Sequence, residues 1–194
     1  MMVITPFEYV TVLISIILGM GITRLVSGLA SIVQRWEKVK TYWPHFLLIL
    51  IVFVIHIQDW WAAYEMAATK TWKLSNFLFA ILYPITLYIS ARLMFPTRWN
   101  VKSIDLKKFY YSNYKKIYLF VLFLPIHSFI ENHYILGYAL QDQLLQIAVF
   151  PIVLFIVLLN RKDEWIHKTV ALLLFAIMLV TFILAKNSLL IMGL

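Results

Sequence analysis

Residues 43–66 read WPHFLLILIVFVIHIQDWWAAYEM, and this stretch decides the fold class. About 20 mainly apolar residues are needed to cross the hydrocarbon core of a bilayer as a helix. Comparable runs recur along the chain, and together the predicted spans cover residues 7–33, 43–66, 74–95, 117–136, 140–159 and 165–185. We therefore predict an all-α integral membrane protein, a single domain over residues 1–194 that forms a bundle of six transmembrane helices.

The composition excludes a water-soluble fold. Apolar residues make up 63% of the chain and charged residues 13%, whereas soluble domains have roughly 45–50% and about 25%. The surplus of apolar side chains needs lipid as its solvent. The chain has no cysteine, which excludes disulfides, thiolate metal sites and a cysteine nucleophile.

The basic residues lie unevenly among the predicted loops. Most of them belong to three alternate loops, which are residues 35–40, 97–116 and 160–168. The remaining loops and the tail hold only Lys70, Lys73 and Lys186. The positive-inside rule places the three basic loops in the cytoplasm and both termini outside. The fifth span is the weakest of the six predictions because polar residues occupy its first turns. If this segment did not cross the membrane, the C-terminus would lie on the other side.

Small residues recur every fourth position along the first span. They are Thr11, Ser15, Gly19, Thr23, Ser27 and Ser31, called below the small-residue face. A spacing of four keeps them on one slowly drifting side of a helix, where another backbone can approach closely. Packing within the bundle is one interpretation. An interface with a second copy or with another membrane protein is the other.

Ionisable residues inside three predicted spans form a candidate polar cluster. His56 and Asp59 share one face of the second span, and His127 and Glu131 share one face of the fourth. Arg24 lies in the first span, and the tilt of helical side chains predicts that it leans toward both acids. A buried carboxylate needs a partner, so we expect these side chains to meet if their helices are neighbours.

Two interpretations of this cluster stay open. It can be a structural ion-pair network, or a path for protons or ions in which Asp59 and Glu131 titrate and His56 and His127 relay protons. Bis-histidine haem b through the two histidines is a weaker alternative, since a neutral ligand does not favour flanking acids. We expect no other cofactor.

Three prolines, Pro84, Pro125 and Pro151, lie close to the middles of the third, fourth and fifth spans. Each removes a backbone hydrogen bond and frees a carbonyl one turn earlier. Kinks at a shared depth can act as hinges or widen a cavity. The alternative is that the prolines only shape the helices for packing.

Several functions lack support in the sequence. The lysines and aromatics of residues 97–116 fit a segment on the lipid headgroup surface, and without a folded basic domain we expect no nucleic-acid partner. The chain has neither a glycine-rich phosphate loop nor an HExxH motif. We expect no catalytic residue and no metal site, and the balance is against an enzyme.

Short motifs give the chain a resemblance to other proteins. They comprise residues 7–9 (FEY), 19–23 (GMGIT), 42–45 (YWPH), 60–61 (WW), 83–84 (YP) and 93–96 (LMFP). In these motifs the chain resembles a group of small, uncharacterised six-helix bacterial membrane proteins. The resemblance implies a multi-pass protein of the bacterial cytoplasmic (inner) membrane, and it implies no activity.

Two functions from different classes follow as hypotheses. The first is a small proton- or ion-linked transporter or channel, or a subunit of one, that uses the polar cluster. The second is a non-catalytic scaffold, sensor or assembly partner that uses the small-residue face. Through this face the protein would form a homo-oligomer or bind another membrane protein. In both hypotheses the lipid bilayer is the surrounding partner.

Overall fold

The computed structural model describes residues 5–63, 73–99 and 102–191. They form six α-helices, and five of these are long and apolar enough to span a membrane. The helices are α1 (Pro6–Gln34), α2 (Trp43–Ala62), α3 (Leu74–Leu93), α4 (Leu106–Ile130), α5 (Leu144–Leu158) and α6 (Glu164–Ile191). The predicted all-α class and the multi-pass membrane character are therefore confirmed.

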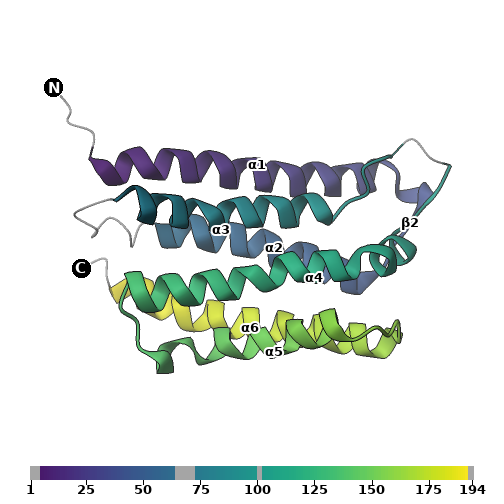
Figure 1. Ribbon diagram of the computed structural model, residues 1–194. Helices are drawn as coiled ribbons and strands as arrows, with labels where there is room; N and C mark the ends of the chain where they lie inside the picture. The colour runs from purple at the N-terminus through teal and green to yellow at the C-terminus, as the bar shows by residue number, and fades with distance from the viewer. Residues whose placement is uncertain (1–4, 64–72, 100–101, 192–194) are drawn as a thin grey trace.

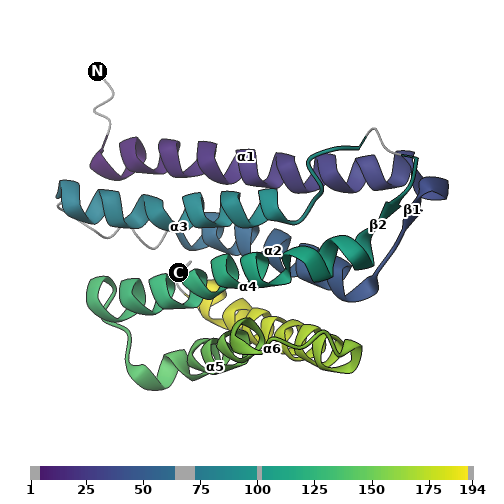
Figure 2. The same ribbon diagram turned by 45° about the vertical axis from the view of Figure 1, so that its right-hand side comes forward.

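Successive helices run in opposite directions within one bundle, as Figure 1 shows. Contacts between neighbours follow the closed order α1, α3, α4, α5, α6, α2 and back to α1. In Figure 2 the first three helices and the last two form separate layers, with α4 between them. Helices α2 and α3 also touch each other, so both help to fill the centre of the bundle.

The segments that join α1 to α2 and α3 to α4 meet at one end of the bundle (Figure 2). After the short 3-10 turn Trp36–Lys38, strand β1 (Val39–Lys40) pairs in parallel with β2 (Ile104–Asp105). The α5–α6 segment lies at this end too (Figure 1). All three basic loops thus gather at what we call the basic end, and the first turn of α1 lies at the opposite end.

Helix α1 is fixed by its cap and by two close contacts. Thr5 and Glu8 form a capping box at its start, which satisfies backbone donors that have no partner inside the helix. Gly21 and Gly28 lie on its buried face, where an added Cβ would collide with the rings of His56 and Phe95 respectively. Close packing of α1 therefore depends on these two glycines.

Helix α4 differs most from its predicted span. It begins at Leu106, well before the predicted start at Ile117, so the lysines and tyrosines of this region belong to the helix. Tyr110 and Tyr114 are buried rather than laid on a surface. This correction follows from a tyrosine repeat of four residues, which turns one face inward. Helix α4 is not among the five helices that length and composition mark as spans.

Both helices that carry the predicted acids end at the opposite end of the bundle. Helix α2 ends at Ala62, and residues 64–66 of the predicted span lie outside the described part of the chain. Helix α4 passes into a π-helical turn at Glu131–Ile135. Gly137, with a φ of 74°, makes the turn that leads into the 3-10 segment Leu140–Gln143 and then α5.

Candidate functional site

The predicted acids lie toward the opposite end rather than at mid-bundle. Asp59 is three residues before the last residue of α2, about 5 Å along the axis. Glu131 opens the π-helical turn that follows α4, and His127 is one helical turn earlier. Single π-helical turns are common at functional sites. We call Asp59, His127 and Glu131 the acidic site.

The surroundings of His127 define its protonation pattern. Its Nε2 lies 2.8 Å from the main-chain oxygen of Phe79 on α3, and its ring stacks on the Phe79 ring at 4.1 Å between centroids. Because a carbonyl oxygen only accepts, Nε2 must carry a hydrogen. In neutral His127 the other nitrogen, Nδ1, is therefore an acceptor.

That second nitrogen faces an acid. His127 Nδ1 lies 3.9 Å from Oε2 of Glu131, and the two side chains are 12% and 14% exposed. The nitrogen is buried and has no hydrogen-bond partner among the described residues. Two acceptors at this separation repel each other unless a proton or a cation lies between them.

Asp59 adds a second carboxyl group to this region. Its Oδ2 is buried and lacks a hydrogen-bond partner in the described part of the chain. Asp59 and Glu131 lie within electrostatic range of each other and of Tyr83 on α3. Among the described residues, no Lys or Arg nitrogen lies within 4.0 Å of a carboxylate oxygen of either acid, the distance that defines an ion pair. The site therefore brings two carboxyl groups together, and the basic side chain beside Glu131 is His127, which is charged only if it is protonated.

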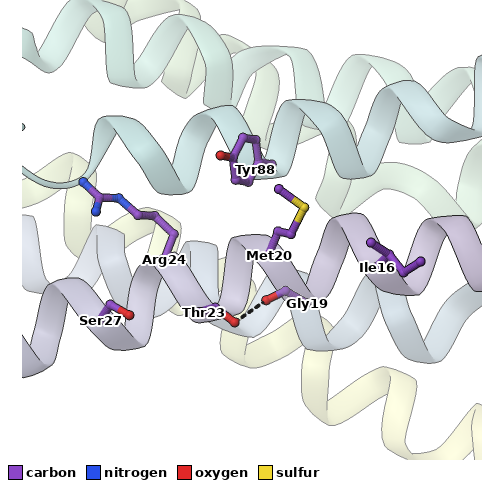
Figure 3. Close-up of a pocket in the computed structure, with 7 residues that line it drawn as sticks. All are labelled: Ile16, Gly19, Met20, Thr23, Arg24, Ser27 and Tyr88. Atoms are coloured by element: carbon purple, nitrogen blue, oxygen red, sulfur yellow. Dashed lines mark hydrogen bonds between the residues drawn. The ribbon is translucent and has the colours of Figure 1, made fainter.

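Arg24, which we predicted beside the acids, lines a groove on the outer face of α1 and α3. The groove is shallow and widely open, has a volume of about 480 Å³ and is lined by Ile16, Gly19, Met20, Thr23, Arg24, Ser27 and Tyr88. In Figure 3 the Arg24 side chain extends toward the Ser27 side, which is the direction of the basic end. Its Nε is buried and has no partner among the described residues. The side chain thus extends away from the acidic site, opposite to the lean that we predicted.

His56 packs against α1 instead of contacting His127. It is fully buried, and its Nδ1 lies 2.7 Å from the Val52 oxygen one turn earlier in α2. Its Nε2 lies against Gly21 and has no partner in the described residues. The ring of His127 instead contacts the rings of Phe79 and Tyr83. Because His127 Nδ1 faces Glu131, these positions do not favour the haem alternative.

An amide network beside the acidic site escaped the sequence analysis. Gln146 of α5 donates to the Pro125 oxygen at 3.0 Å and accepts from the Asn132 amide at 3.3 Å. Gln143 is 2% exposed, and neither of its side-chain polar atoms has a partner among the described residues. In the sequence, the polar start of the fifth span indicates only a weakness of that span, whereas Gln146 binds α4 and the turn that follows it.

The three prolines lie inside helices α3, α4 and α5. Pro84 is buried and Pro151 is exposed, so they do not line one common space. The main-chain oxygen of Pro125 accepts the bond from Gln146, which ties α5 to α4. A hinge role for any of them stays a prediction.

The small-residue face points away from the bundle over its central part. Gly19, Thr23 and Ser27 are exposed, and an added Cβ at Gly19 would meet nothing within 4 Å. The hydroxyl of Thr23 donates to the Gly19 oxygen at 2.7 Å. Packing within the bundle, the first interpretation of this face, belongs instead to the face that contains Gly21 and Gly28.

A second polar cluster, at the basic end, also escaped the sequence analysis. The Tyr110 hydroxyl lies 2.8 Å from His167 Nδ1, and His167 Nε2 lies 3.1 Å from the Arg161 oxygen. Tyr114 donates to the Leu159 oxygen at 3.1 Å. The spacing of Tyr110, Tyr114 and Tyr118 could have revealed this buried face. Its polar groups satisfy one another, which is typical of a structural cluster.

In the described part of the chain, no three or more His, Asp or Glu side chains are grouped as metal ligands, so a cation at the acidic site would rest on the His127–Glu131 pair. Comparisons with known proteins found no match to a protein family, a curated protein or a solved structure. The functional argument therefore rests on the geometry of this chain.

Proposed function

We propose that the protein is a small proton- or ion-linked transporter or channel, or a subunit of one, in the bacterial cytoplasmic membrane. The observation that carries the proposal is the pair of facing acceptors, His127 Nδ1 and Glu131 Oε2, at 3.9 Å. A proton or a cation between them would remove their repulsion. In this proposal it is the transported species.

Asp59 is the second carrier in this mechanism. Its unpartnered oxygen is buried near Glu131, and a carboxylate in such surroundings gains most from a proton or cation. His56, one turn deeper in α2, is the proposed relay, and its Nε2, which lies against Gly21 and has no hydrogen-bond partner among the described residues, would accept the proton. Arg24 has no part in this step.

Six membrane crossings, with both termini outside, complete the proposal. Helix α4 packs between α3 and α5 and runs antiparallel to both (Figure 1). Its lysines are exposed and lie in its first three turns, whereas Ile117–Ile130 is mainly apolar. A crossing by residues 117–136, the predicted fourth span, includes the π-helical turn after α4 and keeps all three basic loops on the cytoplasmic side, as the positive-inside rule requires.

Flux through liposomes that contain the purified protein tests the proposal. We expect Asp59→Asn and Glu131→Gln each to reduce proton or cation flux at least about tenfold, since both remove a group that holds the carried ion. Asp142→Asn, an exposed acid at the same end, is the matched control and should retain flux. Unchanged flux in both site variants would remove the proposal.

A second function, as an assembly partner, is favoured by the outward position of the small-residue face. Exposed small residues allow a partner helix to approach closely. In this case Gly19→Leu should abolish association in the membrane, measured by cross-linking. Leu13→Phe adds bulk elsewhere on the exposed surface of α1 and should preserve association. Association that survives Gly19→Leu would exclude this face as the interface.

A further inference from the structure

The Arg24 groove has the charge and polarity of a lipid-binding site. Arg24 supplies a cation whose Nε is buried without a partner among the described residues. Toward the opposite end the groove is lined by Met20, Gly19 and Ile16, which are apolar or lack a side chain. We propose that this groove binds one anionic phospholipid, with its phosphate at Arg24 and an acyl chain along the apolar part.

The level of Arg24 in the bundle fits a phosphate of the basic-end leaflet. Arg24 is ten residues before the last residue of α1, about 15 Å from that tip. Lys115 and Lys116, both exposed, lie a similar distance from the start of α4. Exposed Arg92 lies one residue before the end of α3. Exposed cations on membrane helices mark the level of the lipid headgroups.

The order of side chains along the groove matches the direction of a lipid in this leaflet. Figure 3 shows the Arg24 guanidinium on the Ser27 side, with Tyr88 of α3 above the middle and Ile16 at the far end. The charged part of the groove thus lies toward the basic end, and the apolar part lies toward the middle of the bundle's length. A phospholipid in the basic-end leaflet has the same polarity.

A lipid fits this groove better than a second copy of the chain. Symmetric pairing through this face would bring two copies of Arg24 together, and like charges at short range repel in apolar surroundings. The Thr23 hydroxyl already donates to its own helix, so it offers no hydrogen to a partner. An anionic phosphate, in contrast, complements the guanidinium by charge and by hydrogen bonding.

Native mass spectrometry of the full chain in neutral detergent tests the inference. Dioleoyl phosphatidylglycerol, dioleoyl phosphatidylcholine and inorganic phosphate are the probes. We expect one phosphatidylglycerol to bind about tenfold more tightly than phosphatidylcholine, because only the first adds net charge at Arg24. Inorganic phosphate should not displace it, since the acyl chain contributes to binding.

Three variants make the test specific. Arg24→Gln should remove the preference for the anionic lipid, and Arg24→Lys should preserve part of it. Gly19→Leu adds bulk to the apolar part of the groove, and its Cβ would meet nothing within 4 Å, so it should weaken both lipids while the fold is preserved. Arg92→Gln removes an exposed cation outside the groove and should leave the preference unchanged.

The inference is overturned if Arg24→Gln retains the anionic preference, or if Arg92→Gln loses it equally, since charge at this level would then act without a defined site. It is also overturned if phosphate displaces the lipid fully. A dimer that Gly19→Leu disperses, with no lipid bound to the monomer, would assign the groove to a second copy instead.

Discussion

Two clusters of buried polar groups, one toward each end of the bundle, differ in how fully they are hydrogen-bonded. At the basic end, His167 is bonded through both ring nitrogens, to Tyr110 and to the Arg161 oxygen. At the opposite end, His127 has one bonded nitrogen, and the other faces Glu131 at 3.9 Å. Asp59 nearby has a buried oxygen without a partner among the described residues.

This difference indicates different roles for the two clusters. A buried polar group that is fully bonded stabilises one arrangement, whereas an unsatisfied buried group is unfavourable unless something else binds it. The His167 cluster thus resembles a fixed framework, and the acidic site resembles a place where a proton or cation enters and leaves. His45, at the basic end, also has a buried ring nitrogen without a partner among the described residues, but no described acid lies within ion-pair distance of it. Substitutions at the two ends should separate these roles.

The largest expected loss of stability belongs to His167→Ala at the basic end. It removes two hydrogen bonds and leaves a cavity between α4 and α6, so we expect a loss of about 3 kcal/mol in unfolding free energy. Denaturant titration in detergent measures it. Asp59→Asn should change this free energy by far less, because it removes an unpaired charge. Equal losses would mean that both ends are structural.

A smaller loss is expected at Gly21, where α1 touches the histidine next to the acidic site. Gly21→Ala places a Cβ against the His56 ring, and we expect it to destabilise the protein by about 1–3 kcal/mol. Gly19→Ala is the matched control, since its Cβ would meet nothing within 4 Å. Thermal unfolding compares them. Equal unfolding temperatures would contradict the close contact between α1 and His56.

The smallest effect is expected at the exposed ion pair of the basic end. Lys107 Nζ lies 2.5 Å from Oε2 of Glu164, and this hydrogen bond raises the pKa of Lys107 above its usual value. A raised lysine pKa stabilises the fold fully below the pKa of the unfolded chain, and this is lost as pH rises through the folded pKa. The contribution is therefore complete at neutral pH and disappears in strong alkali.

Lys107→Gln should lower the unfolding temperature slightly at neutral pH and have no effect in strong alkali, where the wild-type pair has already lost its proton. Lys108→Gln, an exposed neighbour, controls for the change in net charge. A larger effect of Lys107→Gln in alkali than at neutral pH would contradict the sign of this shift.

The apolar runs alone predict the helical membrane class, since a long apolar segment has few other stable forms. The contact between His127 and Glu131 is also predictable, because residues three or four apart share a helix face. His56, which the sequence pairs with Asp59, lies instead against Gly21 of α1. Sequence alone places a residue on a face of its own helix, and it does not say which helix lies opposite.

The remaining features depend on that missing information. Arg24 was expected to lean toward the acids, but its direction depends on the groove between α1 and α3. The small-residue face and the Gly21–Gly28 face are both compatible with close packing, and only the neighbouring helices decide between them. The partners of Gln146 and His167 are on other helices, so no local spacing reveals them.

Infrared difference spectroscopy of the carboxyl groups tests the central claim most directly. We predict that changes in pH or added cation convert a protonated carboxylic acid to a carboxylate, and that this signal is lost in Glu131→Gln or Asp59→Asn but not in Asp142→Asn. If the wild-type protein shows no such conversion, or if both site variants retain it in full, neither acid binds an exchangeable proton and the account is contradicted.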